Sequence, residues 1–417
     1  MRQEFMANNS NNTPRLRFPE FTGEWEEKKL GDVATKRNRR NSRLEVSKVL
    51  TNSANAGIVD QKEYFDRDIA VKENTANYHI VEFEDFVYNP RISTAAPVGP
   101  ISINRVGRGI MSPLYTVFKI HTGCVSFFEQ YFQTTIWHSY LKSIANFGAR
   151  FDRMNITSEG FFNMPLLLPS LSEQQKIAEF LSALDIQITA QAQKVDALKE
   201  KKKGLMQQLF PQSGETTPRL RFPGFEGEWK EKKFKEITFP AGKKNRQNFP
   251  YERYSISNEV GFYPQSEQFE DGGGYLKNID CRQYIIVPPH SFAYNPARIN
   301  VGSIGYQNLD KDVIVSSLYE VFQTKDECND SFLWQWFHSD FFHKMVIDVQ
   351  EGGVRQYFFY EKMKECVISL PSLKEQQKIA ECLSVLDDQI SAESAKIDAL
   401  KNHKKGLMQQ MFPQSSK

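Results

Sequence analysis

One long stretch of the chain occurs twice, and it constrains the fold more than any other feature. Residues 168–213 read LPSLSEQQKIAEFLSALDIQITAQAQKVDALKEKKKGLMQQLFPQS, and residues 370–415 read LPSLKEQQKIAECLSVLDDQISAESAKIDALKNHKKGLMQQMFPQS. The two copies align without a gap at an offset of 202 residues. A repeat of this length indicates that the chain contains two copies of one structural unit.

Both copies are expected to form long helices. Apolar residues recur at alternating steps of four and three positions over more than four heptads, which is typical of a coiled-coil seam. The seam positions are Ile177, Leu181, Leu184, Ile188, Val195 and Leu198 in the first copy, and Ile379, Leu383, Leu386, Ile390, Ile397 and Leu400 in the second. Because such a narrow seam is unstable alone, we expect the two helices to pair with each other. The alternative is that each helix packs separately on its own domain.

The ends of both helices are marked in the sequence. An S-x-x-E capping box follows a proline at Ser170 and again at Ser372, and Pro211 and Pro413 end the helices. Each helix would then have about 38 residues and a length of roughly 57 Å.

Polar residues also occur at matched seam positions, namely Gln191 and Glu393, then Lys202 and Lys404. They either fix the register of the pair or leave the seam open to solvent.

The repeat extends beyond the helices. Residues 13–29 read TPRLRFPEFTGEWEEKK, and residues 217–233 read TPRLRFPGFEGEWKEKK. By contrast, the inserts 36–113 and 243–315 barely align. We expect a lead over residues 1–19, a globular domain over 20–169, a long helix over 170–210, a linker with the second lead over 211–223, a second globular domain over 224–371, a second long helix over 372–412 and a tail over 413–417.

Each globular domain is expected to mix strands and helices. Strand patterns occupy 78–88, 101–106, 114–121, 163–168 and 365–370, and aromatic residues at helical spacing occupy 125–146 and 330–349. The aromatic residues on these helices are expected to lie in the core rather than to form a platform for stacking bases: Phe128, Phe132, Trp137, Trp334, Trp336 and Phe341. The sequence therefore predicts an α+β fold with two mixed, β-rich domains joined by two long paired helices.

Composition and motifs exclude several classes of protein. Five cysteines without a CxxC pair favour reduced thiols in a cytoplasmic protein, and the N-terminal residues lack the apolar segment of a signal peptide. No phosphate-binding loop is present, and seven histidines lack the spacing of metal ligands. Asn89-Pro90-Arg91 lacks the second proline and the aromatic residue of an adenine methyltransferase motif. We therefore expect a non-catalytic chain without metal or cofactor.

Basic clusters with amide side chains occur at matching places in both inserts, over 36–43 and 243–248. Lysine and arginine neutralise phosphates, while arginine, asparagine and glutamine make two-pronged contacts with guanine and adenine. The alternative is a solvated charged surface, and for the Asn-Pro and glycine-flanked turns it is turn geometry alone. We predict DNA contacts for Lys36, Arg37, Asn38, Arg39, Arg40, Arg43, Asn89, Arg91, Arg105, Arg150 and Arg153 in the first domain, and for Lys243, Lys244, Asn245, Arg246, Asn295, Arg298, Asn300, Arg355 and Gln356 in the second.

These features together resemble the specificity (S) subunit of type I restriction-modification systems. The matching motifs are the two RLRFPxFxGEW leads, the PLLLPSLSEQQKIAEFL and VISLPSLKEQQKIAECL junctions, and the two KGLMQQ helix ends. The resemblance implies that each globular block is a target recognition domain that reads half of a bipartite site in double-stranded DNA. It also implies that the helices pair as an antiparallel spacer and dock two methyltransferase subunits. Motor-nuclease subunits would complete the restriction enzyme.

An antiparallel helix pair gives two copies an approximate two-fold axis, so the two domains would read opposite strands about 34 Å apart. Because the inserts differ, we expect unlike half-sites. Candidates for the methyltransferase interface are Gln174, Gln175, Gln376 and Gln377.

Two other functions remain open at this stage. One is a coiled-coil scaffold that binds only proteins, and the other is a single-chain DNA methyltransferase or nuclease, which the missing motifs oppose. Gel shifts of the chain on bipartite DNA, with and without its partners, would test the scaffold, and an assay for methyl transfer by the purified chain without partners would test the enzyme.

Overall fold

The computed structural model describes residues 12–65, 72–146, 152–212, 214–257, 261–267, 280–350 and 357–413. The chain forms two compact units, which are described separately below. Unit 1 contains residues 1–191 and 396–417, and unit 2 contains residues 192–395.

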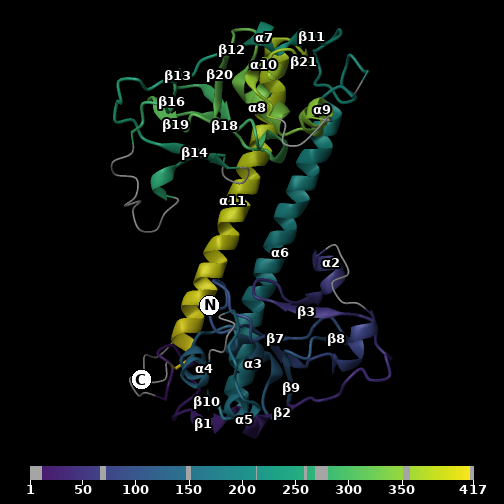
Figure 1. The fold of residues 1–417 in the computed structure, drawn as a ribbon, viewed down its shortest axis with the longest axis vertical. Coiled ribbons are helices and arrows are strands. Elements are labelled where there is room, and N and C mark those ends of the chain that lie inside the picture. The colour runs from purple at the N-terminus through teal and green to yellow at the C-terminus, as the bar shows by residue number, and fades with distance from the viewer. Residues whose placement is uncertain are drawn as a thin grey trace. The chain divides into compact units, whose positions relative to one another are not determined.

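Unit 1 is built on a four-stranded antiparallel sheet with the strand order β2-β9-β6-β7 (Figure 1). Its elements are β1 (Glu26–Lys29), α1 (Leu30–Val33), β2 (Ala34–Lys36), β3 (Leu50–Ser53), β4 (Gly57–Asp60), α2 (Gln61–Phe65), η1 (Lys72–Asn77), β5 (His79–Val81), β6 (Phe86–Tyr88), β7 (Ile101–Ile103), β8 (Gly109–Met111), β9 (Thr116–Ile120), α3 (Val125–Tyr131), α4 (His138–Ile144), α5 (Ser158–Phe162) and β10 (Pro165–Leu168). The pairs β1-β10, β3-β4 and β5-β8 complete it.

Unit 2 repeats this plan with the sheet order β12-β20-β17-β18. Its elements are β11 (Lys230–Lys233), α7 (Phe234–Ile237), β12 (Thr238–Pro240), β13 (Lys243–Lys244), β14 (Tyr254–Ser257), β15 (Gly261–Pro264), η2 (Gln265–Glu267), β16 (Ile285–Val287), β17 (Ser291–Tyr294), η4 (Ile299–Val301), β18 (Ile304–Gln307), β19 (Val313–Val315), β20 (Glu320–Thr324), α8 (Asp330–Phe337), α9 (Asp340–Gln350), α10 (Tyr360–Met363) and β21 (Val367–Leu370). A three-stranded sheet β13-β16-β19 and the pairs β14-β15 and β11-β21 complete it. The predicted α+β architecture is confirmed.

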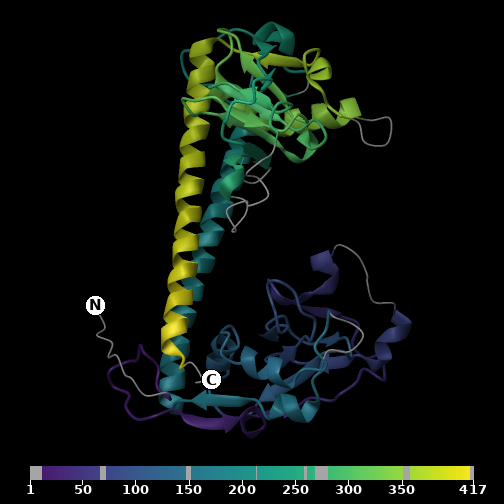
Figure 2. The same ribbon diagram turned by 60° about the vertical axis from the view of Figure 1, so that its left-hand side comes forward.

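The two long helices are α6 (Leu171–Leu209) and α11 (Leu373–Met411), each of 39 residues. Each helix contributes to both units, because the division of the chain falls within it. In unit 2, Lys194 of α6 pairs with Glu393 of α11, and Lys202, further along α6, pairs with Asp387, which comes earlier in α11. The two helices are therefore antiparallel there. In unit 1 the start of α6 and the end of α11 lie side by side (Figures 1 and 2).

The predicted helix pairing is confirmed, and each helix also packs on its own domain. The seam residues at the start of each helix lie in a domain core: Ile177 and Leu181 in unit 1, Ile379 and Leu383 in unit 2. Further along, the seam residues Ile188 and Ile390 are half-buried. The helices therefore pair, and each also packs on the domain that precedes it.

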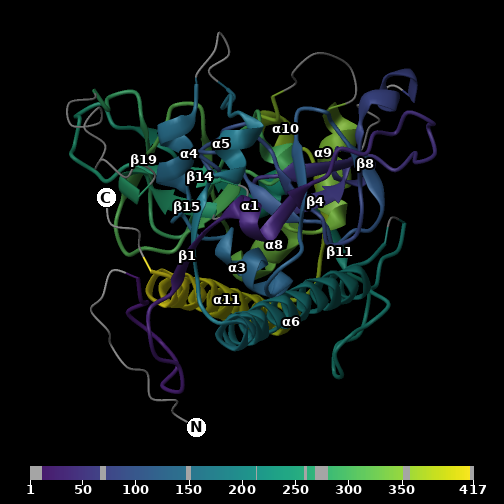
Figure 3. The same cartoon turned by 90° about the horizontal axis from the view of Figure 1, so that it is seen from below.

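Each core is completed by the far end of the other long helix. The core of unit 1 contains Met411 and Phe412 from the end of the chain, and that of unit 2 contains Leu209 and Phe210. α3 lies between the helix pair and the rest of unit 1 (Figure 3). The repeated LFPQ and MFPQ motifs thus supply core residues as well as helix ends.

Three predicted elements are divided. The strand expected over 78–88 is β5 and β6 in separate sheets, because residue Glu84 takes a left-handed φ of 65° between them. The helix expected over 125–146 is α3 and α4, and 330–349 likewise holds α8 and α9. In both, a hydroxyl donates back to a carbonyl of the preceding turn, Thr134 to Tyr131 and Ser339 to Trp336, which competes with helix continuation.

The predicted core aromatics are confirmed. Phe128, Phe132, Trp137 and Trp336 are buried, and Trp334 and Phe341 are partly buried against the core of unit 2.

Candidate nucleic-acid interface

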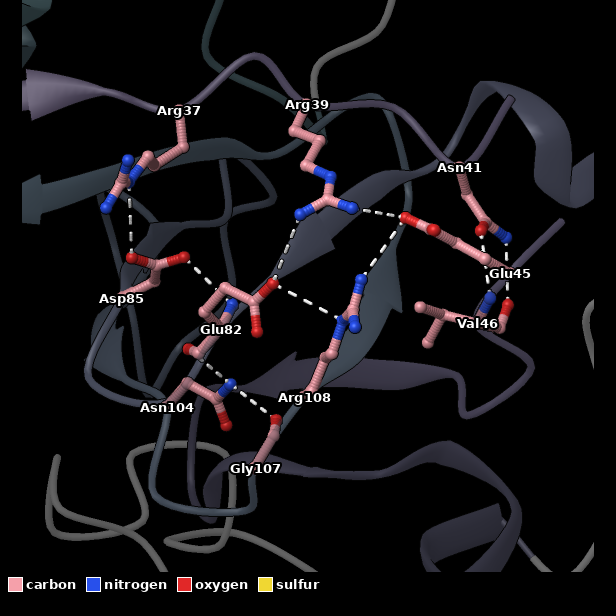
Figure 4. A network of polar contacts seen from close by, with 10 residues as sticks. All are labelled: Arg37, Arg39, Asn41, Glu45, Val46, Glu82, Asp85, Asn104, Gly107 and Arg108. Atoms are coloured by element: carbon pink, nitrogen blue, oxygen red, sulfur yellow. Dashed lines mark hydrogen bonds and ion pairs between the residues drawn. The ribbon is translucent and has the colours of Figure 1, made fainter. Parts of the chain in front are cut away.

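The basic segment that follows β2 runs beside β5 and is held there by backbone contacts. The Asn41 amide donates to the Tyr78 carbonyl, and the Ile80 amide donates to the Arg39 carbonyl. β8 pairs with β5 on its other edge. Side chains from three separate parts of the sequence, near residues 39, 82 and 108, therefore meet at one surface (Figure 4).

A buried asparagine fixes the shape of this segment in both units. Asn41 is 0% exposed, and its amide group bonds the Val46 carbonyl at 2.8 Å and the Val46 amide at 3.1 Å. Asn245 is 1% exposed and makes the same two bonds with Phe249, both at 2.9 Å. The polar atoms of Asn245 are used inside the loop, which disfavours a contact with DNA, and that contact stays a prediction.

Asn89 also organises the backbone around it, and its contact with DNA stays a prediction. Its Nδ2 donates to the Asn52 carbonyl at 2.9 Å, and its Oδ1 accepts from the Arg91 amide at 3.0 Å. Gly99 takes a positive φ of 77° beside it, and a Cβ there would lie 2.0 Å from the Asn89 carbonyl oxygen. In unit 2 the Asn295 Oδ1 accepts from the Ala297 amide at 3.0 Å, so this side chain also organises its own turn. Turn chemistry explains both asparagines.

Most of the predicted basic side chains of unit 1 contact a partner within the same unit. Arg37 Nε lies 3.6 Å from the Asp85 carboxylate, and Arg105 bonds Glu84 at 3.0 Å and Glu129 at 2.6 Å. Arg40 donates to the Asn77 carbonyl and Lys36 to the Ser158 hydroxyl. Asp85 is buried, and burial raises the pKa of its carboxyl, opposed by the bond from the Glu82 amide and by Arg37.

The other predicted residues are placed as follows. Asn38, Arg43, Arg91, Lys243, Lys244, Arg246, Arg298 and Asn300 are exposed, and Arg153 is half-buried beside Asp152. Arg150, Arg355 and Gln356 lie outside the described residues. The exposed residues stay predictions of DNA contact.

Sequence reasoning missed the acidic partners and Arg108. Arg39 and Arg108 both contact Glu45 and Glu82. The acidic residues in 82–85 could have indicated ion pairs with nearby arginines. Only the pairing of β5 with β8 shows that they lie beside the basic segment.

The charged side chains of unit 2 form different pairs on the same frame. Lys311 bonds Glu252 at 2.8 Å, and Lys244 bonds the Gln283 side chain at 3.0 Å. The buried Gln307 takes the place of Asn104: each donates from its amide nitrogen to two carbonyls and accepts one backbone amide. The frame is therefore shared, and the exposed charges are not.

The start of each long helix is tied to its domain by an ion pair whose glutamate is buried. Arg17 donates to both carboxylate oxygens of Glu173 at 2.8 and 2.7 Å, and Arg221 donates to both oxygens of Glu375 at 2.7 and 2.8 Å. Only one of the two hydrogen bonds of each predicted capping box is therefore formed. The Ser170 and Ser372 hydroxyls accept hydrogen bonds from the Glu173 and Glu375 backbone amides, while the glutamate side chains bind arginine instead. This explains why the PRLRFP leads and the SEQQ and KEQQ junctions recur together.

Two of the predicted methyltransferase contacts, Gln174 and Gln376, are buried and bonded within the chain, which disfavours that role, and they stay predictions. Gln174 is 5% exposed and its Oε1 accepts from the Cys124 amide; Gln376 is 0% exposed and accepts from the Asn329 amide. Both side chains join the helix start to the α3 or α8 start. Gln175 and Gln377 are exposed and stay candidates.

The polar seam positions are paired rather than open to solvent. In unit 1, Lys404 bonds Asp185 at 2.6 Å, and Gln130 of α3 bonds the same carboxylate at 2.8 Å. In unit 2, Lys202 and Gln335 bond Asp387 at 2.6 and 2.8 Å. These contacts between helices and with α3 or α8 favour the prediction that the lysines fix register.

Comparison with known proteins identifies the family. The sequence pattern of the type I restriction modification DNA specificity domain matches residues 22–200 and again 226–402. The chain therefore belongs to the type I restriction-modification DNA specificity family.

A curated relative and two solved structures agree with this. The specificity subunit of the type I restriction enzyme MjaVIII from Methanocaldococcus jannaschii is 24% identical over 265 residues, which span 60% of this chain and 61% of that subunit. The S subunit of a type I restriction-modification system from M. genitalium has a TM-score of 0.56 at 12% identity, covering 96% of this chain and 99% of the other. A chain from a structural study of the complex assembly and conformational transition of the type I R-M system has a TM-score of 0.54 at 15% identity, covering 94% and 98%. At these identities the two structures support the fold alone.

Within the described residues, no cluster of histidine, cysteine, aspartate or glutamate could hold a metal ion. Across that same part of the chain, no helix is long and apolar enough to cross a membrane.

Proposed function

We propose that this chain is the DNA-recognition subunit of a cytoplasmic type I restriction-modification complex, and that it performs no catalysis itself. Each globular domain would read one half of an asymmetric bipartite site in double-stranded DNA. Methyl transfer and cleavage would be carried out by two methyltransferase subunits and by motor-nuclease subunits that assemble with it.

One observation supports this proposal most strongly. Two specificity domains occur in one chain, with the same buried frame and different exposed charges. A shared frame suits a common task and a common partner. Different side chains at the surface suit two different half-sites, because bases are distinguished by the donors and acceptors presented to them.

The paired helices are proposed to set the distance between the half-sites and to dock the methyltransferase subunits. Exposed helix residues near the domains, such as Gln175 and Gln377, fit the second role. The ion pairs at both helix starts support the first role, since a spacer must be joined firmly to the domain beside it. The division of the chain into seven segments expected from the sequence also stays part of this proposal.

DNA binding tests the proposal. The purified chain, with and without its methyltransferase subunits, is incubated with genomic fragments, and bound fragments are sequenced at several salt concentrations. We expect enrichment of one two-part sequence and an affinity that falls as salt rises, because phosphate contacts release counterions. Binding without sequence preference, or methyl transfer by the chain alone, would refute it.

A further inference from the structure

Two arginines and two glutamates form a closed group on the surface of unit 1, here called the charge ring: Arg39, Glu45, Arg108 and Glu82. Glu45 Oε1 accepts from Arg39 Nη2 at 2.5 Å and from Arg108 Nη2 at 3.2 Å. Glu82 Oε1 lies 3.8 Å from Arg39 Nη1 and 3.3 Å from Arg108 Nε. Each carboxylate therefore faces both guanidinium groups (Figure 4).

The charge ring does not serve stability. The four side chains are 38 to 58% exposed, and ion pairs at such positions contribute about 0–1 kcal/mol. It does not suit a phosphate contact either. Two positive and two negative charges cancel, so the group releases no counterions from DNA, and its carboxylates repel phosphate oxygens.

The charge ring does suit the edge of a base pair. A guanidinium has five N–H donors, so the carboxylates leave donors available, and arginine in fixed orientation bonds guanine O6 and N7 together. A carboxylate can accept from the cytosine amino group. Guanidinium groups held in place before binding lose less side-chain entropy when a base arrives.

The backbone beneath the charge ring is held by buried amide side chains. Asn104 donates to the Glu82 carbonyl at 2.8 Å and to the Gly107 carbonyl at 2.7 Å, next to Arg108. Asn41 spans the loop that carries Glu45. The charged side chains of the ring therefore extend from backbone segments that are held in place by buried hydrogen bonds.

Unit 2 has the frame without the ring. At the positions that match Arg39 and Glu82 it has Lys243 and Pro288, counted from Asn41 with Asn245 and from Val81 with Val287. Glu45 has no counterpart, because Asn245 bonds Phe249 four residues on, whereas Asn41 bonds Val46 five residues on. The two units thus keep the same buried amide frame but carry different exposed side chains. Two unlike half-sites require such a difference.

We infer that the charge ring reads G·C base pairs in the half-site of unit 1, with Arg39 and Arg108 as its specificity-determining residues and Glu45 and Glu82 as the groups that orient them. This inference rests on the proposed function. It goes further by assigning one chemistry of recognition to four residues.

The test uses the full chain assembled with its methyltransferase subunits and a pool of DNA sites in which every base of the recognised sequence is varied. Arg39→Lys and Arg108→Lys keep the charge and lose the forked donors. Each should reduce discrimination at one or two G·C positions of one half-site by roughly 5- to 150-fold, with the other half-site and the salt dependence unchanged. Glu82→Gln should reduce the same discrimination and make binding more sensitive to salt, because a released arginine can contact phosphate.

Arg219→Lys is the matched control, because Arg219 forms an exposed ion pair with Glu215 at 3.2 Å outside the inserts. It should alter nothing. Unchanged discrimination in both ring variants would overturn the inference, as would an equal loss of affinity for all sequences with a weaker salt dependence. A wild-type complex with no sequence preference would remove the proposed function as well, whereas a selective wild type with unaltered variants would remove this inference alone.

Discussion

Phe412, the second-last residue that the structure describes, is buried in the core of unit 1, whose other members come mainly from the N-terminal part of the sequence. It is 1% exposed, and its ring lies 5.5 Å from Phe127, 5.8 Å from Tyr131 and 6.2 Å from Trp25, centroid to centroid. Phe210 holds the matching place in unit 2, against Trp229 and Phe332.

We therefore predict that Phe412→Ala destabilises unit 1 and leaves unit 2 intact, while Phe210→Ala does the reverse. Truncation of a core phenylalanine costs about 3–5 kcal/mol. Amides that exchange only when the unit unfolds should then exchange roughly 150- to 5,000-fold faster.

Hydrogen exchange followed by mass spectrometry measures this. The reporters are peptides with β6 and β9 for unit 1 and with β17 and β20 for unit 2, since these strands are central in matching sheets. Phe412→Leu serves as a mild control that retains apolar volume. If Phe412→Ala increased exchange only near the C-terminus, or equally in all four strands, the assignment of the chain's end to the core of unit 1 would be wrong.

Three other predictions follow from the contacts. Glu173→Ala should lower the unfolding free energy by about 3–5 kcal/mol in chemical denaturation, because it leaves Arg17 buried and unpaired, while the double change Arg17→Met with Glu173→Leu should recover most of this loss; equal losses in both would contradict it. Burial lowers the pKa of His79, with Arg40 and Lys36 adding to the effect, and burial also lowers the pKa of His138 and His338. The unfolded chain therefore takes up protons before the folded chain as the pH falls below the ordinary histidine value of about 6.5, so the melting temperature should fall between pH 7.5 and 5.5. His79→Gln should weaken that fall, and a melting temperature that does not change with pH would refute the histidine contribution. Four residues inserted after Gln191 and again after Glu393 should lengthen each helix by about 6 Å and widen the unread spacer by about two base pairs with both half-sites unchanged; methylome sequencing that shows the original spacer would contradict the role of the helices as a ruler.

The helices were predictable because their signal is local and occurs twice. A four-three periodicity over four heptads defines an apolar face, and the prolines at 211 and 413 define the ends. Periodicity does not report what covers the face. The sequence therefore left open whether the helices pair or pack on their domains, and the cores show that Ile177 and Ile379 lie within the domains as well.

The polar residues were harder to assign, since exposed and buried amides look the same in a sequence. Asn89, Gln174 and Gln376 satisfy backbone groups of segments that the fold brings to them, whereas Asn245 satisfies those of its own loop. Glu173 fits a local capping box but bonds Arg17, which is distant in sequence and offers two charged hydrogen bonds. Local patterns could not reveal these partners. The matched recurrence of Arg17 and Arg221 with Glu173 and Glu375 was the available clue.

The central claim is that one chain directs methylation to two unlike half-sites, one for each domain. Sequencing the methylated genome of a host that carries this chain with its methyltransferase partners tests it most directly. The account predicts a single asymmetric motif of two short parts separated by a fixed run of unread bases. It also predicts that replacing residues 36–113 with the insert of another family member changes only one of the two parts. Methylation at one uninterrupted motif, at two identical inverted halves, or at both parts altered by that single replacement would contradict it.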